Sequence, residues 1–282
     1  MSMRLNLQSW RAQQRLGRLA RTLILVGVLF VFALPLAWSS LAALGINPNR
    51  ILNKSQALQF TFEHFAEIGL TEPNFVREMV TSALIAIGTT ALALLIGFPA
   101  AHVLARARFR SKAPLTHSLL VLASLPVMAY VIPLSDVLHR LHLLDTLIGL
   151  VLAQAAAVTP WVVYVLMGYI SALPVAIDEA AMLEGATPIL VAVRIVLPAV
   201  LPQVIATAVI VAALCWNAFL LPLVLAGASV KTVPVAMSDF FTFERELEWP
   251  TAAAALVASL SPLIALLVAA SHALLQFELR DA

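Results

Sequence analysis

This sequence has little charge and almost no cysteine. Of its 282 residues, 11% are charged and 62% are hydrophobic, whereas soluble domains average about 25% charged and about 45–50% apolar residues. Such a chain cannot bury its apolar side chains in one soluble core, so the composition indicates a polytopic membrane protein. Since Cys215 is the single cysteine, a disulfide within the chain is excluded.

Motifs for nucleotide binding and catalysis are missing as well. The sequence has no Gly-x-x-x-x-Gly-Lys-Ser/Thr segment, so any ATP-driven work needs a partner protein. Serine and threonine are scattered without a nucleophile–base arrangement. His139 and His142 have a spacing that a metal could use, but we interpret them as an interfacial cap and predict no metal site. The basic residues flank apolar runs, which does not indicate nucleic-acid binding.

Six apolar runs are long enough to cross a membrane as helices, which takes about 20 residues. They lack the two-residue alternation of a lipid-facing strand, which argues against a barrel. Each run contains Pro or Gly, which neighbouring helices tolerate in a bundle. We therefore predict an all-α membrane protein with six transmembrane helices. The runs are residues 22–44, 80–105, 114–138, 146–172, 199–226 and 250–276.

The distribution of Lys and Arg predicts an orientation. With the N-terminus in the cytoplasm, eleven of the 17 Lys and Arg residues fall in cytoplasmic segments, as the positive-inside rule requires. The cluster at 106–112 is the strongest anchor. We predict a cytoplasmic segment 1–21 and a single transmembrane domain 22–282, with both termini in the cytoplasm. The main connections are the outside loops 45–79 and 227–249 and the cytoplasmic loop 174–198.

Residues 174–198 form a short charged segment between two apolar runs. A proline ends the fourth run, and Asp178 and Glu179 place negative charge near a helix start, where the helix dipole favours it. Gly185 permits a turn or a close approach by another surface. Pro198 suits the first turn of the next helix. We predict a short helix parallel to the membrane, followed by a turn into the fifth span.

The same segment resembles the EAA coupling loop in the membrane subunits of bacterial ABC importers. The match consists of Glu179-Ala180-Ala181, Gly185 and Ile195-x-Leu197-Pro198. In that family the loop is cytoplasmic and is pushed by the ATPase, and the count of basic residues independently places residues 174–198 in the cytoplasm. The ATPase-coupling residues that the resemblance implies are Glu179, Ala180, Ala181, Glu184, Gly185, Ala186, Ile195, Leu197 and Pro198.

Further matches resemble the carbohydrate-uptake branch of these importers. The sequence Met182-Leu-Glu-Gly-Ala186 is closer to the sugar branch than to polyamine and metal importers, which usually read Asp-Leu-Gly-Ala. Two departures are Glu184, where the family commonly has Asp, and a C-terminus without the common Gly-rich tail. The resemblance covers about residues 75–275. Its other motifs are Leu143-Leu-Asp-Thr146, Trp216-Asn-Ala-Phe-Leu220, Thr232-Val-Pro-Val235 and Trp249.

The resemblance implies a transmembrane subunit of an ATP-driven importer for a sugar or a related polyol or sugar derivative, in the bacterial cytoplasmic (inner) membrane. Its implied partners are a second homologous permease subunit, two copies of an ABC ATPase, an extracytoplasmic solute-binding protein and the lipid bilayer. ATP and Mg²⁺ would be bound by the ATPase, and this chain would hold no cofactor and perform no catalysis.

Two alternatives come from other classes of protein. An ion-gradient-driven secondary transporter would need ionisable residues at mid-membrane depth, and such residues are nearly absent from the predicted spans. The other is an integral membrane enzyme or assembly scaffold. Co-purification with an ATPase would distinguish the importer from both.

A sugar pathway usually combines aromatic faces with amide and hydroxyl groups. Asn217 lies in an apolar run, and an unpaired buried amide would cost roughly 1–3 kcal/mol, so its side chain must have a hydrogen-bond partner. The candidates by residue type are Tyr130, Trp161, Tyr164, Trp216 and Asn217.

Overall fold

The computed structural model describes residues 2–46, 60–70, 75–107, 109–227, 229–240 and 249–281. Every regular element in these ranges is helical, which confirms the predicted all-α class. The chain divides into two compact units, Met1–Ile68 with Leu247–Ala258 and Gly69–Glu246 with Ser259–Ala282. Much of the predicted loops 45–79 and 227–249 lies outside the described residues.

The first unit contains α1 (Ser2–Ala43), most of α3 (Glu63–Leu70) and the first residues of α14 (Trp249–Asp281). The Thr251 hydroxyl donates a hydrogen bond of 2.8 Å to the Glu67 carboxylate. This hydrogen bond lowers the pKa of Glu67. Part of the predicted outside loop is therefore helical, and α3 is attached to the start of α14.

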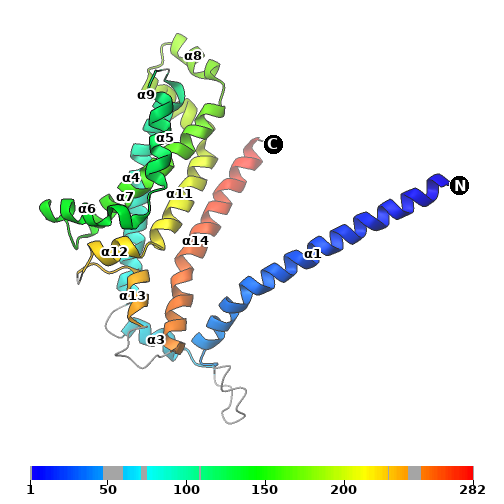
Figure 1. Ribbon diagram of the computed structural model, residues 1–282, viewed down its shortest axis with the longest axis vertical. Helices are drawn as coiled ribbons and strands as arrows, with labels where there is room; N and C mark the ends of the chain where they lie inside the picture. The colour runs from blue at the N-terminus through cyan, green and yellow to red at the C-terminus, as the bar shows by residue number, and fades with distance from the viewer. Residues whose placement is uncertain are drawn as a thin grey trace. The chain divides into compact units, whose positions relative to one another are not determined.

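The second unit is organised around α4 (Phe75–Arg106), which packs on α7 (Leu147–Ala172) and α11 (Leu201–Trp216) (Figure 1). A Cβ atom added to Gly97 would lie 2.7 Å from a methyl carbon of Val162. Small residues allow such close helix packing in membranes, where dispersion contacts replace the hydrophobic effect. The glycine therefore sets the distance between α4 and α7.

Four helical segments are long and apolar enough to cross a membrane. They are Arg21–Ala43, Phe75–Arg106, Leu147–Ala172 and Trp249–Gln276, and the total over the described residues is six if each of two bent helix pairs is one span. The four segments confirm the predictions over 22–44, 80–105, 146–172 and 250–276. Helix α4 begins five residues earlier than predicted, inside the expected outside loop.

The third predicted span is not a straight helix. Helices α5 (Lys112–Ala123) and α6 (Val127–Arg140) meet at 92°, so the prediction of one helix over 114–138 is wrong (Figure 1). The break lies at Pro126, whose backbone is extended. Proline has no N–H to donate to the carbonyl four residues earlier and disfavours helical backbone in the residue before it.

The fifth predicted span, 199–226, is interrupted as well. Helix α11 ends at Trp216 and α12 (Leu220–Leu225) follows as a separate helix. The side-chain amide of Asn217 donates a hydrogen bond to the Ala213 carbonyl at 2.8 Å and so caps the C-terminal end of α11. Pro222 has no N–H to donate to the carbonyl of residue 218, which weakens a helix at this point.

A turn centred on Asp145 joins the segment before α7 to the segment between α12 and α13 (Val233–Asp239). The Asp145 carboxylate accepts hydrogen bonds from the amides of Gly227, Ser229 and Val230 at 2.7, 2.9 and 3.1 Å. Partial burial opposes its ionisation, but these hydrogen bonds outweigh that effect and lower the pKa of Asp145 to about 2. Asp145 therefore has a structural role within the Leu143–Thr146 motif.

Candidate ATPase-coupling segment

The predicted coupling segment consists of two short helices joined by a glycine turn. Helix α8 (Val175–Leu183) follows Pro174, and α9 (Pro188–Val191) begins after Thr187. Gly185 has a φ of 94°, a conformation that glycine adopts without the steric cost of a Cβ atom. The Thr187 hydroxyl accepts a hydrogen bond from the Leu190 amide at 3.3 Å and caps α9. The short helix and the turn at Gly185 are both present.

Pro198 does not lie in the first turn of the long helix that follows the segment, which corrects the sequence interpretation. After α9 the chain continues through a π-helical turn, Ala192–Val196, into α10 (Leu197–Ala199), where Pro198 lies. Helix α11 starts at Leu201 and meets the helix Pro188–Ala199 at 80°. The proline in the first turn of α11 is Pro202. Thr187 and Pro188 form the cap and the first-turn proline of α9, a signal that the sequence analysis overlooked.

The predicted coupling segment exposes apolar side chains on both sides of the turn at Gly185. Leu183 and Ile189 are 90% and 77% exposed, and Figure 1 shows α8 and α9 at one end of the α4, α7 and α11 bundle. Apolar side chains on the spanning helices are also exposed, but those face lipid, whereas this segment connects two spans, where an apolar surface is suited to contact another protein. Other exposed apolar side chains of the same segment are Val175, Ile177, Met182, Leu190 and Val193.

The nine predicted coupling residues divide into two groups. Ala181, Ala186, Ile195 and Leu197 are half-buried, and Ala181, Ala186 and Leu197 pack against the core of the unit. The exposed members can reach a partner directly, whereas the half-buried members hold the segment in place. The exposed members are Glu179, Ala180, Glu184, Gly185 and Pro198.

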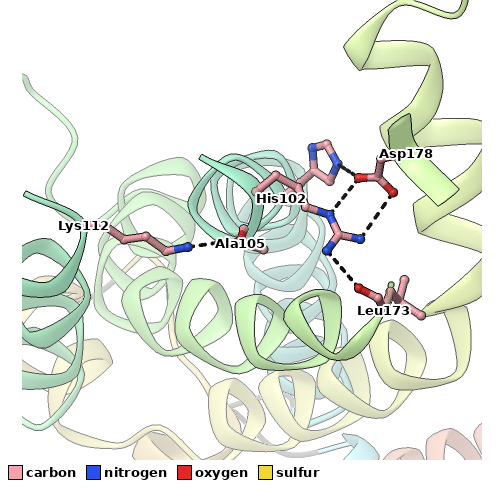
Figure 2. Close-up of polar contacts among 6 residues, drawn as sticks. His102, Ala105, Lys112, Leu173 and Asp178 are labelled. Atoms are coloured by element: carbon pink, nitrogen blue, oxygen red, sulfur yellow. Dashed lines mark hydrogen bonds and ion pairs between the residues drawn. The ribbon is translucent and has the colours of Figure 1, made fainter. Parts of the chain in front are cut away.

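An ion pair attaches α8 to the end of α4. The Arg106 guanidinium donates to both Asp178 carboxylate oxygens, at 2.7 and 3.3 Å, and to the Leu173 carbonyl at 3.0 Å (Figure 2). The two charged side chains are 13% and 6% exposed. His102 lies 3.7 Å from the same carboxylate, and Lys112 donates to the Ala105 carbonyl at 3.1 Å.

Sequence reasoning missed this ion pair. It interpreted Asp178 as a charge that interacts with a helix dipole and Arg106 as a membrane-flanking residue. The two residues are 72 positions apart in the sequence. No local pattern connects them. A buried bidentate pair of arginine and carboxylate has a defined geometry and a high cost of breaking, so it fixes α8 relative to α4.

The five pathway candidates do not share one environment. Tyr130 and Trp161 are half-buried against different hydrophobic clusters, and Tyr164 is exposed on α7. Trp216 is buried, whereas the exposed Asn217 side chain donates to the backbone of its own helix. The amide partner that the sequence analysis required is thus the Ala213 carbonyl. A role in solute binding remains a prediction for all five residues.

The sequence analysis did not single out Gln154. This residue of α7 is 2% exposed, and neither side-chain amide atom has a hydrogen-bond partner among the described residues. A buried amide normally finds a partner, because leaving it unpaired costs its desolvation free energy. Its signal in the sequence was an amide inside an apolar run, the same signal that drew attention to Asn217.

Comparison with known proteins places this geometry in a family. Residues 93–280 match the family described as "Binding-protein-dependent transport system inner membrane component". A putative ABC transporter permease of Streptomyces antibioticus is 34% identical over 65% of this chain and 81% of its own length. The trehalose transport system permease SugB of Mycobacterium tuberculosis is 28% identical over 83% of this chain and 86% of its length.

Solved structures show the same fold. A bacterial ABC transporter involved in the import of the acidic polysaccharide alginate has a chain that matches with a TM-score of 0.70 at 16% identity, over 88% of this chain and 93% of that chain. A chain of the methionine transporter MetNI matches with a TM-score of 0.59 at 15% identity, over 73% of this chain and 98% of that chain. The chain therefore belongs to the family of inner membrane components of binding-protein-dependent transport systems, the multi-pass permease subunits of ABC transporters.

Proposed function

We propose that this chain is the transmembrane subunit of an ATP-driven importer for a sugar or a related polyol or sugar derivative. The observation that carries the proposal is the exposed apolar surface of residues 174–198, attached to α4 through Arg106 and Asp178. An ATPase subunit docks on this surface, and its movement on binding and hydrolysing ATP reorients the permease.

The substrate class is supported by the names of relatives. They include the trehalose permease SugB, a trehalose/maltose transport system permease of Thermococcus litoralis, 27% identical over 87% of this chain, and a diacetylchitobiose uptake permease of Streptomyces coelicolor, 26% identical over 76%. These solutes all carry many hydroxyl groups. The five pathway candidates (Tyr130, Trp161, Tyr164, Trp216 and Asn217) offer aromatic faces and hydrogen-bonding groups to such a solute.

The importer needs several further subunits. We assign a second homologous permease subunit, two copies of an ATPase that binds ATP and Mg²⁺, and a solute-binding protein outside the membrane. A structural relative has been solved together with an alginate pentasaccharide-bound periplasmic protein, which supports the last assignment. This chain holds no nucleotide and performs no bond-breaking step itself.

Both termini and the coupling segment lie in the cytoplasm in this proposal. The test places cysteines at the exposed residues Ser111 and Ser229 in a Cys215→Ala background. A membrane-impermeant thiol reagent should label Ser111→Cys only from the cytoplasmic side and Ser229→Cys only from outside. The opposite labelling pattern would place the coupling segment outside and exclude ATPase docking there.

Transport itself is tested in proteoliposomes. The permease is purified with the ATPase, second permease and binding protein encoded beside it, and uptake of radiolabelled trehalose, maltose and chitobiose is measured. Uptake of at least one sugar should require ATP inside and the binding protein outside. Uptake driven by an ion gradient without ATP would contradict the proposal and favour a secondary transporter.

A further inference from the structure

We propose that Arg106 and Asp178 remain paired throughout the transport cycle and that this pair transmits movement of the coupling segment to α4. The inference rests on the proposed function and deepens it. It makes Arg106 and Asp178 positioning residues, since neither is expected to touch the solute or the nucleotide.

The geometry of the pair favours permanent closure. Two hydrogen bonds join the guanidinium to the carboxylate, and a third joins it to the Leu173 carbonyl at the end of α7 (Figure 2). Opening the pair would leave two charges in a largely buried site, which carries a high desolvation cost. The attachment therefore behaves as a fixed connection between α7, α8 and α4.

Helix α4 is suited to carry movement away from this connection. It is a helix of 32 residues that continues through Pro99, about 48 Å long at 1.5 Å per residue. Its packing against α7 through Gly97 and Val162 is close along the way. A bend within α4 would disturb this packing, so displacement of one end is passed to the other.

A second polar attachment lies toward the other end of α4. The Ser82 hydroxyl accepts a buried hydrogen bond of 2.8 Å from the Val233 amide at the start of α13. Ser82 and Arg106 are 24 residues apart, about 36 Å along the helix. Helix α4 thus links the coupling segment to the segment 229–240, which is outside the membrane or at its outer face in the proposed topology.

Two other roles for the pair give different expectations. If the pair only supports folding, its loss lowers stability and yield without changing the maximal rate per folded complex. If the pair opens in every cycle, holding α4 and α8 together stops transport. Only a permanent connection predicts that a covalent link can replace the ion pair.

The test replaces the pair by cysteines, Arg106→Cys with Asp178→Cys, in a Cys215→Ala background. Before cross-linking, the complex should still co-purify with the ATPase but lose at least tenfold in solute-stimulated ATP hydrolysis and uptake. Bridging the two thiols with a short bifunctional reagent should restore at least a third of the wild-type rate. A single Arg106→Cys variant treated with the same reagent is the control and should not recover.

Bridged complexes that remain inactive would overturn the proposal, and so would an unbridged variant with the wild-type rate. A conservative variant covers the case in which the double cysteine variant does not fold. Arg106→Lys keeps the charge but loses the fork of donors. It should lower the maximal uptake rate three- to tenfold with an unchanged KM for the loaded binding protein, and an unchanged maximal rate would contradict the inference.

A readout independent of the solute separates this inference from the proposed function. ATP with vanadate should change the thiol labelling rate of Ser229→Cys in wild-type membranes and change it far less in the Arg106→Lys background. An equal change in both backgrounds refutes transmission through the pair. Failure of wild-type complexes to import any sugar refutes the substrate assignment instead, whatever the labelling shows.

Discussion

The coupling segment and the Asp145 turn both depend on one aspartate, but the partners differ. Asp178 contacts side chains, Arg106 at 2.7 Å and His102 at 3.7 Å, whereas Asp145 accepts hydrogen bonds from the backbone amides of Gly227, Ser229 and Val230. A side-chain pair can hold a helix whose outer surface stays free for another protein. Backbone amides instead close two connecting segments on each other. In the first arrangement the hydrogen bonds to the carboxylate come from one side chain, Arg106, and in the second they come from three backbone amides.

The largest effect is expected from removing one member of the Arg106–Asp178 pair. Arg106→Gln leaves the Asp178 carboxylate buried without its cation and should destabilise the protein by about 3–5 kcal/mol. Adding Asp178→Asn should recover part of this loss, because no buried charge is left unpaired. Chemical unfolding of the two variants in detergent measures the difference. A double variant less stable than Arg106→Gln would contradict the assignment of a buried pair.

Gly149 tests how closely the chain is packed beside the Asp145 turn. A Cβ atom there would clash with the Leu143 carbonyl oxygen, so Gly149→Ala should cost about 1–3 kcal/mol, as overpacking does. Gly168→Ala in the same helix α7 is the matched control, since its Cβ would meet nothing within 4 Å. The control should be neutral or slightly stabilising, and equal thermal shifts for both variants would refute this packing.

Asp145 makes the turn sensitive to pH in a defined window. Its pKa falls from 3.8 to about 2 on folding, so its charge stabilises the folded state above about pH 4 and loses this effect as the pH falls toward 2. Asp145→Asn should therefore cost about 1–2 kcal/mol at pH 6, after allowance for solvent screening. The difference in melting temperature between the wild type and Asp145→Asn should be smaller at pH 3 than at pH 6. An equal difference at both pH values would show that the Asp145 charge is not its cause.

The smallest effect is expected at Gln154, which belongs to neither region. Gln154→Leu removes a buried amide without a partner in the described part of the chain and should stabilise the protein by about 1 kcal/mol. Thr207→Val is a comparison, since this buried hydroxyl is satisfied by the Gln203 carbonyl at 2.7 Å. A loss of stability in Gln154→Leu would show that the amide has a partner after all, such as an internal water.

The sequence predicted the long helices, because a long helix in a membrane depends mainly on how apolar one continuous segment is. Four apolar runs became long helices although each contains a proline, namely Pro35, Pro99, Pro160 and Pro262. Pro126 and Pro222 lie in equally apolar runs, yet the first lies at a bend of 92° and the second lies in a separate short helix after the end of α11. Membrane helices tolerate proline when neighbours satisfy the freed carbonyls, and that condition depends on tertiary packing. Apolarity alone therefore could not distinguish a tolerated proline from a break.

The coupling segment shows the same limit at the level of single residues. The sequence offered a turn or a close approach at Gly185, and the structure shows the turn, because a glycine after a short helix has a local reason to adopt positive φ. The Arg106–Asp178 and Asp145–Gly227 contacts join residues 72 and 82 positions apart. A single sequence holds no record of which distant charges meet, so both attachments required the structure.

The central claim is that residues 174–198 couple this permease to an ATPase, and solute-stimulated ATP hydrolysis measures it most directly. Glu179 and Leu183 are exposed on this segment, so substitutions there alter docking without disturbing the core. Subunits carrying Glu179→Lys or Leu183→Glu should insert normally, but solute-stimulated ATP hydrolysis by their reconstituted complexes should fall at least tenfold. Glu179→Gln should give a rate between those of the wild type and Glu179→Lys. Stimulation at the wild-type level in both variants would contradict the assignment of this segment as the ATPase-coupling surface.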